Sequence, residues 1–298
     1  MTAGRSSIVE EPLWPVPPAA RSARPSVVRQ LVRDRIALIG LVILVTMGAV
    51  AVLGPILAPA DPNAQDVAHR FAGPSAAHPL GTDNLGRDEL TRILYGARVS
   101  LLTALVVGAL VLAIGVAVGA VSGFAGGLID GAIMRIADVL LAFPSLLLAL
   151  AVAGFLGPGL VHLAIAMVAV WWVEYARLVR GLVLAIKERP FVEAARAVGL
   201  PPWRVAARHV LPNLLPPVIV LATLRTGSLL LALAALSFLG LGIAPPTPEW
   251  GAMLNDAQDY LANAAQLMLY PGLAITIAVL GFNLLGDGLR DVLDPTLR

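Results

Sequence analysis

The sequence predicts an all-α membrane protein with six transmembrane helices. Of its 298 residues, 58% are hydrophobic and only 13% are charged, whereas about a quarter of an ordinary soluble domain is charged. Several uncharged runs exceed the roughly 20 residues that cross a bilayer as a helix. There is no cysteine, which excludes disulfides, thiolate metal sites and a cysteine nucleophile.

The first span follows an irregular N-terminal segment. Residues 1–28 are predicted to be a disordered cytoplasmic tail, because prolines recur there without periodicity. An uncharged run then covers Ile36–Ala60. Ala58 and Ala60 resemble a signal-peptide cleavage site, but the run is longer than the roughly 7–15 residues of a signal peptide. We therefore expect an uncleaved first span, in a unit of residues 29–98 that also contains an outer loop.

The other five spans are expected in residues 99–298, where glycines, prolines and charges divide the apolar sequence. Span two lies in the uncharged run Val99–Ile129 and ends near Gly126. The run Val139–Val173 is too long for one helix, and Gly157-Pro158-Gly159 divides it into spans three and four. Spans five and six are placed at Asn213–Ile243 and Tyr260–Gly286.

The distribution of basic residues sets the orientation of these spans. With a cytoplasmic N-terminus, sixteen of the Lys and Arg residues lie inside and four outside. This asymmetry follows the positive-inside rule, so both termini and the segment between spans four and five are predicted to be cytoplasmic. In such a chain the basic residues report topology, and we expect lipid contacts and no nucleic-acid binding.

The outer loops contain two amphipathic patterns. Asp88–Arg98 is predicted to form an interfacial helix before span two. In the last outer loop, apolar residues from Trp250 to Leu261 repeat at helical spacing, which indicates an interfacial helix with a tryptophan anchor; contact with an extracytoplasmic binding protein is the alternative. His69 and His78 lie among acidic residues of the first outer loop, but a solvated, hydrogen-bonded loop is favoured over a metal site.

The segment of residues 188–212 interrupts the apolar spans with a compact pair of short helices. Pro190 suits the first turn of a helix, and Gly199 suits the left-handed residue that ends it. Pro201-Pro202 then opens a second helix. In this helix one apolar stripe is expected at i, i+3, i+4 and i+7: Trp203, Ala206, Ala207 and Val210. The pattern alone allows two interpretations of this segment, a docking surface and an ordinary solvated loop.

This segment resembles the EAA motif of ATP-binding-cassette importer permeases. The matching residues are Glu193-Ala194-Ala195, Gly199 and Leu211-Pro212, at the family's spacing. The chain from about Leu31 onward is similar to the second membrane subunit of dipeptide, oligopeptide and nickel importers. Five stretches carry this likeness: HPLGTDNLGRDELTRILYGARVSL, MRIADVLLAFP, LSFLGLG, PPTPEWGAML and NLLGDGLRDVLDP.

The resemblance implies the type I importer permease fold and a bacterial inner-membrane location. It implies that residues 188–212 hold a coupling helix for a cytosolic ATPase, in which Glu193, Ala194, Ala195 and Gly199 make the contact and Leu211-Pro212 leads into span five. The partners would be a homologous second permease, two cytosolic ATP-binding subunits and an extracytoplasmic binding protein. The only lysine, Lys187, lies in no Walker A loop, so ATP and Mg²⁺ would bind the partner chains, and this chain would carry no cofactor and no metal.

Span five contains two further candidate features. Arg225 lies near mid-bilayer, where a charge is costly and faces protein or water; it is either a pore residue or half of an ion pair with Asp138, Glu174 or an acid of a partner. Gly240 and Gly242 indicate a gate over Ser237–Gly242 that includes Phe238, with close helix packing as the alternative. Relatives often carry a Glu where this chain has Leu233.

The sequence therefore predicts a non-enzymatic permease subunit that forms half of a pore for di- or oligopeptides. Nickel or another small solute is the alternative cargo within the family. A transporter of another class, an ion-coupled secondary transporter, is the alternative to an ATP-driven importer. No catalytic motif in the sequence supports a membrane enzyme.

Overall fold

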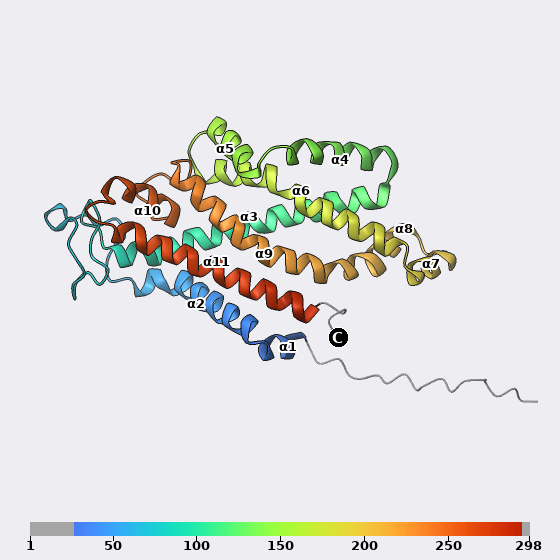
Figure 1. Cartoon of the computed structure of the whole chain (residues 1–298), viewed down its shortest axis with the longest axis horizontal. Helices are drawn as coiled ribbons and strands as arrows, with labels where there is room; N and C mark the ends of the chain where they lie inside the picture. Colours follow the sequence, from blue (N-terminus) through green and yellow to red (C-terminus); the bar gives the residue numbers. More distant parts are fainter. Residues whose placement is uncertain (1–26, 294–298) are drawn as a thin grey trace, which may run out of the picture.

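The computed structural model describes residues 27–293, and helices dominate this part of the chain (Figure 1). In chain order the elements are α1 (Val27–Arg33), α2 (Arg35–Leu57), η1 (Val67–His69), α3 (Glu89–Ala125), α4 (Gly127–Leu141), α5 (Ser145–Leu156), α6 (Leu160–Lys187), α7 (Pro190–Ala197), α8 (Pro202–Val205), η2 (Ala206–Val210), α9 (Leu211–Phe238), α10 (Trp250–Ala257), η3 (Gln258–Tyr260) and α11 (Gln266–Leu293). Within residues 27–293 the only β-pairing is an isolated bridge between Thr82 and Asp88.

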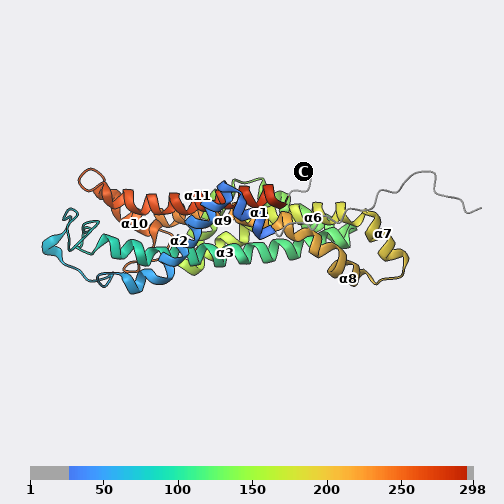
Figure 2. The same cartoon turned by 90° about the horizontal axis from the view of Figure 1, so that it is seen from below.

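Five helices are long and apolar enough to cross a membrane: α2, α3, α6, α11, and α9 together with the turns of α8 and η2 that precede it. They run lengthwise beside one another in both views (Figures 1 and 2). Helix α3 packs along α6 and α2, and α11 packs along α2 and α9. The predicted helical membrane fold is confirmed for the described residues.

The predicted third span is not a straight helix. Helices α4 and α5 form a pair bent by 89°, and the bend falls at Ala142-Phe143-Pro144. Proline lacks the N–H that a continuing helix needs, and it disfavours helical backbone in the residue before it. Six spans result if this pair counts as one crossing. The predicted break at Gly157-Pro158-Gly159 is confirmed, because α5 ends at Leu156 and α6 begins at Leu160.

The helical part of the chain begins earlier than predicted. Residues 27 and 28, assigned to the tail, already belong to α1, and the rest of that predicted tail lies outside the described residues. The Asp34 side chain then accepts a hydrogen bond from the Ala37 backbone N–H at 2.9 Å and caps α2. Such a cap satisfies one of the free N–H groups of a helix start.

The expected interfacial helix over Asp88–Arg98 is instead the first part of α3. This helix runs unbroken from Glu89 to Ala125, and Asp88 caps it by accepting from the Thr91 N–H at 2.8 Å. The boundary predicted between residues 98 and 99 therefore falls inside one helix.

The predicted tryptophan anchor is also wrong. Trp250 is only 1% exposed, and its indole N–H donates to the Ile93 carbonyl at 3.1 Å. A Cβ on Gly96 would lie 2.9 Å from the Trp250 ring, so glycine is required for this approach. Helix α10 is thus docked on α3 through its tryptophan. Leu261 lies beyond the end of α10.

Close contact between α3 and α6 depends on three glycines at four-residue spacing. A Cβ on Gly115, Gly119 or Gly123 would lie 2.4–2.7 Å from atoms of α6. Small residues repeated every four positions place two helix backbones in direct contact. This pattern is visible in the sequence, although it does not by itself say which helix is the neighbour.

Candidate functional site

The segment of residues 188–212 forms an elbow at one end of the molecule. Helices α7 and α8 extend beyond the bundle there, whereas α10 and the loop of residues 58–88 lie at the opposite end (Figures 1 and 2). Pro190 occupies the first turn of α7 as predicted. Its missing N–H is one that no helix start can satisfy internally.

The corner of the elbow is a Schellman motif. The Leu200 N–H donates to the Ala195 carbonyl at 3.2 Å, and the Gly199 N–H donates to the Arg196 carbonyl at 2.9 Å. Gly199 has φ +79°, and nothing lies within 4 Å of the position its Cβ would take. The predicted helix end at Gly199 is confirmed. Glycine is needed there for its backbone conformation and not for space.

The inner face of the elbow is fixed to the bundle by apolar packing. Val192 and Ala195 of α7, Val205 of α8 and Val210 of η2 are buried in one cluster with residues of α6 and α9. Leu200 packs against the same cluster. The elbow is therefore mounted on two long helices, so that a force applied to it is transmitted to both.

One sequence expectation about the elbow needs correction. The predicted apolar stripe of the second helix is not buried along its length, because Val210 is buried whereas Trp203 is 65% exposed and Ala207 is also exposed. The stretch Ala206–Val210 is π-helical, and its wider turn shifts the side chains away from the predicted α-helical register. Ala195, another residue of the predicted contact, is buried in the apolar cluster of the inner face.

The outer face of the elbow presents Glu193 and Ala194, together with Val198, which is 78% exposed. Within residues 27–293 the Glu193 carboxylate makes no hydrogen bond or ion pair. The Arg204 guanidinium stacks over the Trp203 ring at 5.1 Å. This face combines small apolar residues with free charges, as expected for a surface that contacts another protein. Leu211 and Pro212 are exposed where the elbow joins α9.

Ion pairs tie the helices together beside the elbow. The Arg180 guanidinium binds the Asp130 carboxylate through two N–H groups, one of them at 2.6 Å, and Ser122 donates to the same carboxylate. Lys187 donates to the Gly123 carbonyl at 3.0 Å. The end of α3, the start of α4 and the end of α6 are thereby held in one arrangement.

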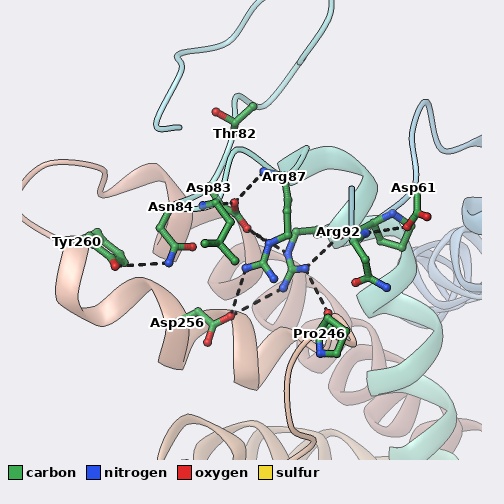
Figure 3. A network of polar contacts seen from close by, with 12 residues as sticks. Asp61, Thr82, Asp83, Asn84, Arg87, Arg92, Pro246, Asp256 and Tyr260 are labelled. Carbon is green, nitrogen blue, oxygen red and sulfur yellow. Dashed lines mark hydrogen bonds and ion pairs between the residues drawn. The ribbon is translucent and has the colours of Figure 1, made fainter. Parts of the chain in front are cut away.

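A second polar cluster lies at the opposite end of the molecule (Figure 3). The Arg87 Nε donates to Asp83 Oδ2 at 2.5 Å, and the Arg92 Nε lies 3.5 Å from the same oxygen. Asp256 of α10 lies 3.6 Å from Arg87 and 3.9 Å from Arg92. Asp83, Arg87 and Arg92 are almost fully buried. Burial raises the pKa of the Asp256 carboxyl above its ordinary value, although both guanidinium groups oppose the rise.

This cluster corrects the expectation of a solvated first outer loop. The loop is hydrogen-bonded as predicted, but its central charges form a buried core that fastens residues 58–88 to α3 and α10. His78 pairs with Asp88 at 2.9 Å, and the exposed His69 pairs with Asp66 at 2.7 Å. In the described part of the chain, no three acidic or histidine side chains are grouped as metal ligands would be.

Arg225 of α9 forms an ion pair with Glu174 of α6, at 3.0 Å between Arg225 Nη2 and Glu174 Oε2. Glu174 is one of the three partners that the sequence left open. The Arg225 side chain remains 43% exposed and that of Glu174 30%. Leu233, where relatives often carry Glu, is buried in the main apolar core.

The end of α9 is a closely packed turn. The Leu241 N–H donates to the Leu236 carbonyl at 3.1 Å, and Gly240 has φ +83°, which repeats the Schellman geometry of the elbow. A Cβ on Gly242 would lie 2.2 Å from Ser237 Oγ. Glycine is therefore needed at residue 240 for its positive φ and at residue 242 for the close approach of Ser237. Phe238 is half-buried and lines a groove of about 380 Å³ between α9, α10 and α11.

The long apolar helices define the class of protein, an integral membrane protein, and the elbow extends from one end of its bundle (Figure 1). Residues 115–298 match the family described as binding-protein-dependent transport system inner membrane component. Residues 26–74 match the N-terminal transmembrane domain of oligopeptide transport permease C.

The chain belongs to this family of ABC importer permease subunits, which are inner-membrane components. It is 43% identical over 272 residues to the dipeptide transport system permease protein DppC of Alkalihalophilus pseudofirmus. The aligned region covers 91% of this chain and 89% of that protein. It is 45% identical over 271 residues to the glutathione transport system permease protein GsiD of Shigella flexneri (91% and 89%). It is 42% identical over 259 residues to the nickel transport system permease protein NikC of Escherichia coli K12 (87% and 94%).

Proposed function

We propose that this chain is one of two different permease subunits of an importer for di- and oligopeptides. It forms half of the pore, and the elbow at residues 188–212 receives the motion of a cytosolic ATPase. ATP and Mg²⁺ bind two such ATPase subunits, and a binding protein outside the membrane delivers the cargo. Similarity to relatives named for dipeptide and glutathione transport supports the cargo class.

The geometry of the elbow is the observation that carries this proposal. Its inner face is locked into the apolar cluster of α6 and α9, while Glu193 and Ala194 remain exposed on the other side. A contact element must be rigid toward the pore and accessible toward the motor, and the elbow has both properties. The predicted cytoplasmic side of the elbow and of both termini is part of the proposal.

The test reconstitutes the importer, with both permeases, the two ATPase subunits and the binding protein, in liposomes and measures ATP-dependent uptake of a radiolabelled dipeptide. Gly199→Ala forces a side chain into the left-handed region, at a cost of about 1–2 kcal/mol, and should distort the corner. Glu193→Arg reverses the free charge on the outer face. Both variants should insert normally and lose most ATP-stimulated uptake.

Gly181→Ala is the matched control, because Gly181 is helical in α6 and a Cβ there meets nothing within 4 Å. This variant should transport as the unchanged protein does. If both elbow variants kept full uptake and full ATPase stimulation, the coupling role would be refuted, and an ion-coupled secondary transporter would be favoured.

A nickel importer is the second candidate, because a relative of 42% identity carries that name. The same liposomes distinguish the two cargoes. ATP-dependent uptake of labelled nickel without uptake of the dipeptide would replace the peptide proposal and would leave the coupling role intact.

A further inference from the structure

The Glu174–Arg225 ion pair lies at the midpoint of two spanning helices. Glu174 is 14 residues from the first residue of α6 and 13 from the last, and Arg225 holds the same place in α9. At about 1.5 Å per residue, each charge is roughly 20 Å from either helix end. Charged groups at this depth face protein or water and not lipid.

A groove opens along the same two helices, and it is lined by residues that are close to Glu174 and Arg225 in the chain, although not by the pair itself. This open groove of about 870 Å³ runs between α6, α9 and α11. Leu178, one turn after Glu174, and Leu224, directly before Arg225, both line it. Asn213, Arg189 and Arg290 line it nearer to the elbow. Its walls are otherwise largely apolar.

The two charges retain unused binding capacity. A guanidinium carries five N–H donors, and within residues 27–293 Arg225 contacts only the Glu174 carboxylate. Glu174 Oε2 is buried and accepts no hydrogen bond of good geometry from the described residues, whereas 30% of the Glu174 side chain and 43% of the Arg225 side chain remain exposed. A bound molecule with one carboxylate and one ammonium group could therefore engage both residues without leaving either charge unpaired, which is the condition under which buried charges are tolerated.

From this placement we infer that the groove is the part of the translocation path that this subunit contributes, and that Glu174 and Arg225 together bind the ammonium and carboxylate groups of a zwitterionic peptide in transit. The inference rests on the proposed peptide importer and adds the residues that the cargo contacts. Exchange of one ion pair for another keeps the binding weak, and a transport path requires binding weak enough for release. Arg189 and Arg290 at the mouth favour cargo that carries a carboxylate.

The first test compares three cargoes in the reconstituted importer: dialanine, N-acetyl-dialanine and dialanine amide. Arg225→Gln should reduce the preference for dialanine over its amide by about tenfold or more, and Glu174→Gln should reduce the preference over the acetylated form similarly. The binding protein is the same in every assay, so a change in these ratios between variants arises in the membrane subunit.

The double variant Glu174→Arg with Arg225→Glu separates recognition from structure. It restores an ion pair of opposite direction between the same helices. We expect normal insertion with altered cargo ratios. If the single variants lowered uptake of all three cargoes equally and the double variant restored uptake of all three, the pair would be structural only and the inference would be overturned.

The second test asks what fills the groove. The chain has no cysteine, so Leu178→Cys or Leu224→Cys introduces one thiol, in an importer whose other subunits are also cysteine-free. A charged thiosulfonate should label both positions, and saturating dialanine should slow the reaction. Ile219→Cys is the control, because this exposed position of α9 does not line the groove and should stay unlabelled.

Two outcomes would refute the groove assignment. Absence of labelling at Leu178 and Leu224 would show that the partner permease covers the groove, and labelling by apolar maleimides alone would show that lipid fills it. An importer with no ATP-dependent dialanine uptake before any substitution would instead refute the proposed function, and the labelling result would still report on the path.

Discussion

The substitution Asp83→Asn tests whether the buried charge cluster holds the outer loop to the bundle. Asp83 lies between the guanidinium groups of Arg87 and Arg92, at 2.5 and 3.5 Å. Its other oxygen accepts from the backbone N–H groups of Leu85 and Arg87, both at 2.9 Å. Asparagine keeps an oxygen for these backbone bonds and removes the negative charge.

The expected loss of stability follows from the burial of the arginines. After the substitution, the carboxylate contacts that Arg87 and Arg92 retain among the described residues are those with Asp256, at 3.6 and 3.9 Å. Arg92 also keeps its hydrogen bonds to the Pro62 and Pro246 carbonyls. Removing one partner of a buried ion pair costs about 3–5 kcal/mol, because the remaining charge stays buried and uncompensated. A solvated loop would lose less than about 1 kcal/mol.

Asp256→Asn provides the matched control within the same cluster. Burial raises the pKa of the Asp256 carboxyl, so the folded state already disfavours its charged form, and its contacts with the arginines are longer. We expect a cost well below that of Asp83→Asn. Thermal unfolding of the purified permease, followed by tryptophan fluorescence, measures both, since Trp250 of the same α10 is buried. Equal and small losses in the two variants would refute the buried-cluster reasoning.

Two further substitutions address the elbow and the bundle. Val192→Ala removes two buried methyl-sized groups from the elbow mount and should cost about 2 kcal/mol, with weaker ATP-stimulated uptake at normal expression. Val198→Ala, on the exposed face, should leave stability unchanged. Equal thermal shifts in the Val192 and Val198 variants would contradict the packing of the inner face of the elbow against α6 and α9. Gly119→Val places a side chain within 2.4 Å of the Ala176 carbonyl and should prevent stable packing of α3 on α6. Gly131→Ala, where a Cβ meets nothing within 4 Å, should be tolerated, and normal yield of the Gly119 variant would refute that close contact.

Much of the fold could be predicted from local sequence. Membrane helices are read from length and apolarity because the bilayer demands internal hydrogen bonding over a fixed thickness. Breaks at Gly157-Pro158-Gly159 and at Gly199 were predictable for a related reason, since glycine and proline restrict or extend the backbone whatever surrounds them. The resemblance to importer permeases followed from motifs in order along the chain, and the family match confirms it.

Two of the three errors come from contacts with distant parts of the chain, and the third comes from a local change of helix type. Asp83, Arg87 and Arg92 look like a solvated loop in sequence, because charged residues are rarely buried unless paired, and their partner Asp256 is supplied by a distant helix. Trp250 looks like an interfacial anchor until Gly96 of α3 provides the space for its ring. The apolar stripe predicted after Pro202 was wrong because the π-helical turn Ala206–Val210 changes the direction in which the later side chains point.

By itself, the sequence determined the class of protein, the apolar crossings and the position of the elbow, because these depend on composition and on backbone preferences that act within a few residues. Only the tertiary structure decided which side of the elbow is buried, that Glu174 is the partner of Arg225, and that a groove opens between α6, α9 and α11. Those features depend on contacts between residues far apart in the chain, and the pattern of one helix cannot specify the helix that packs against it.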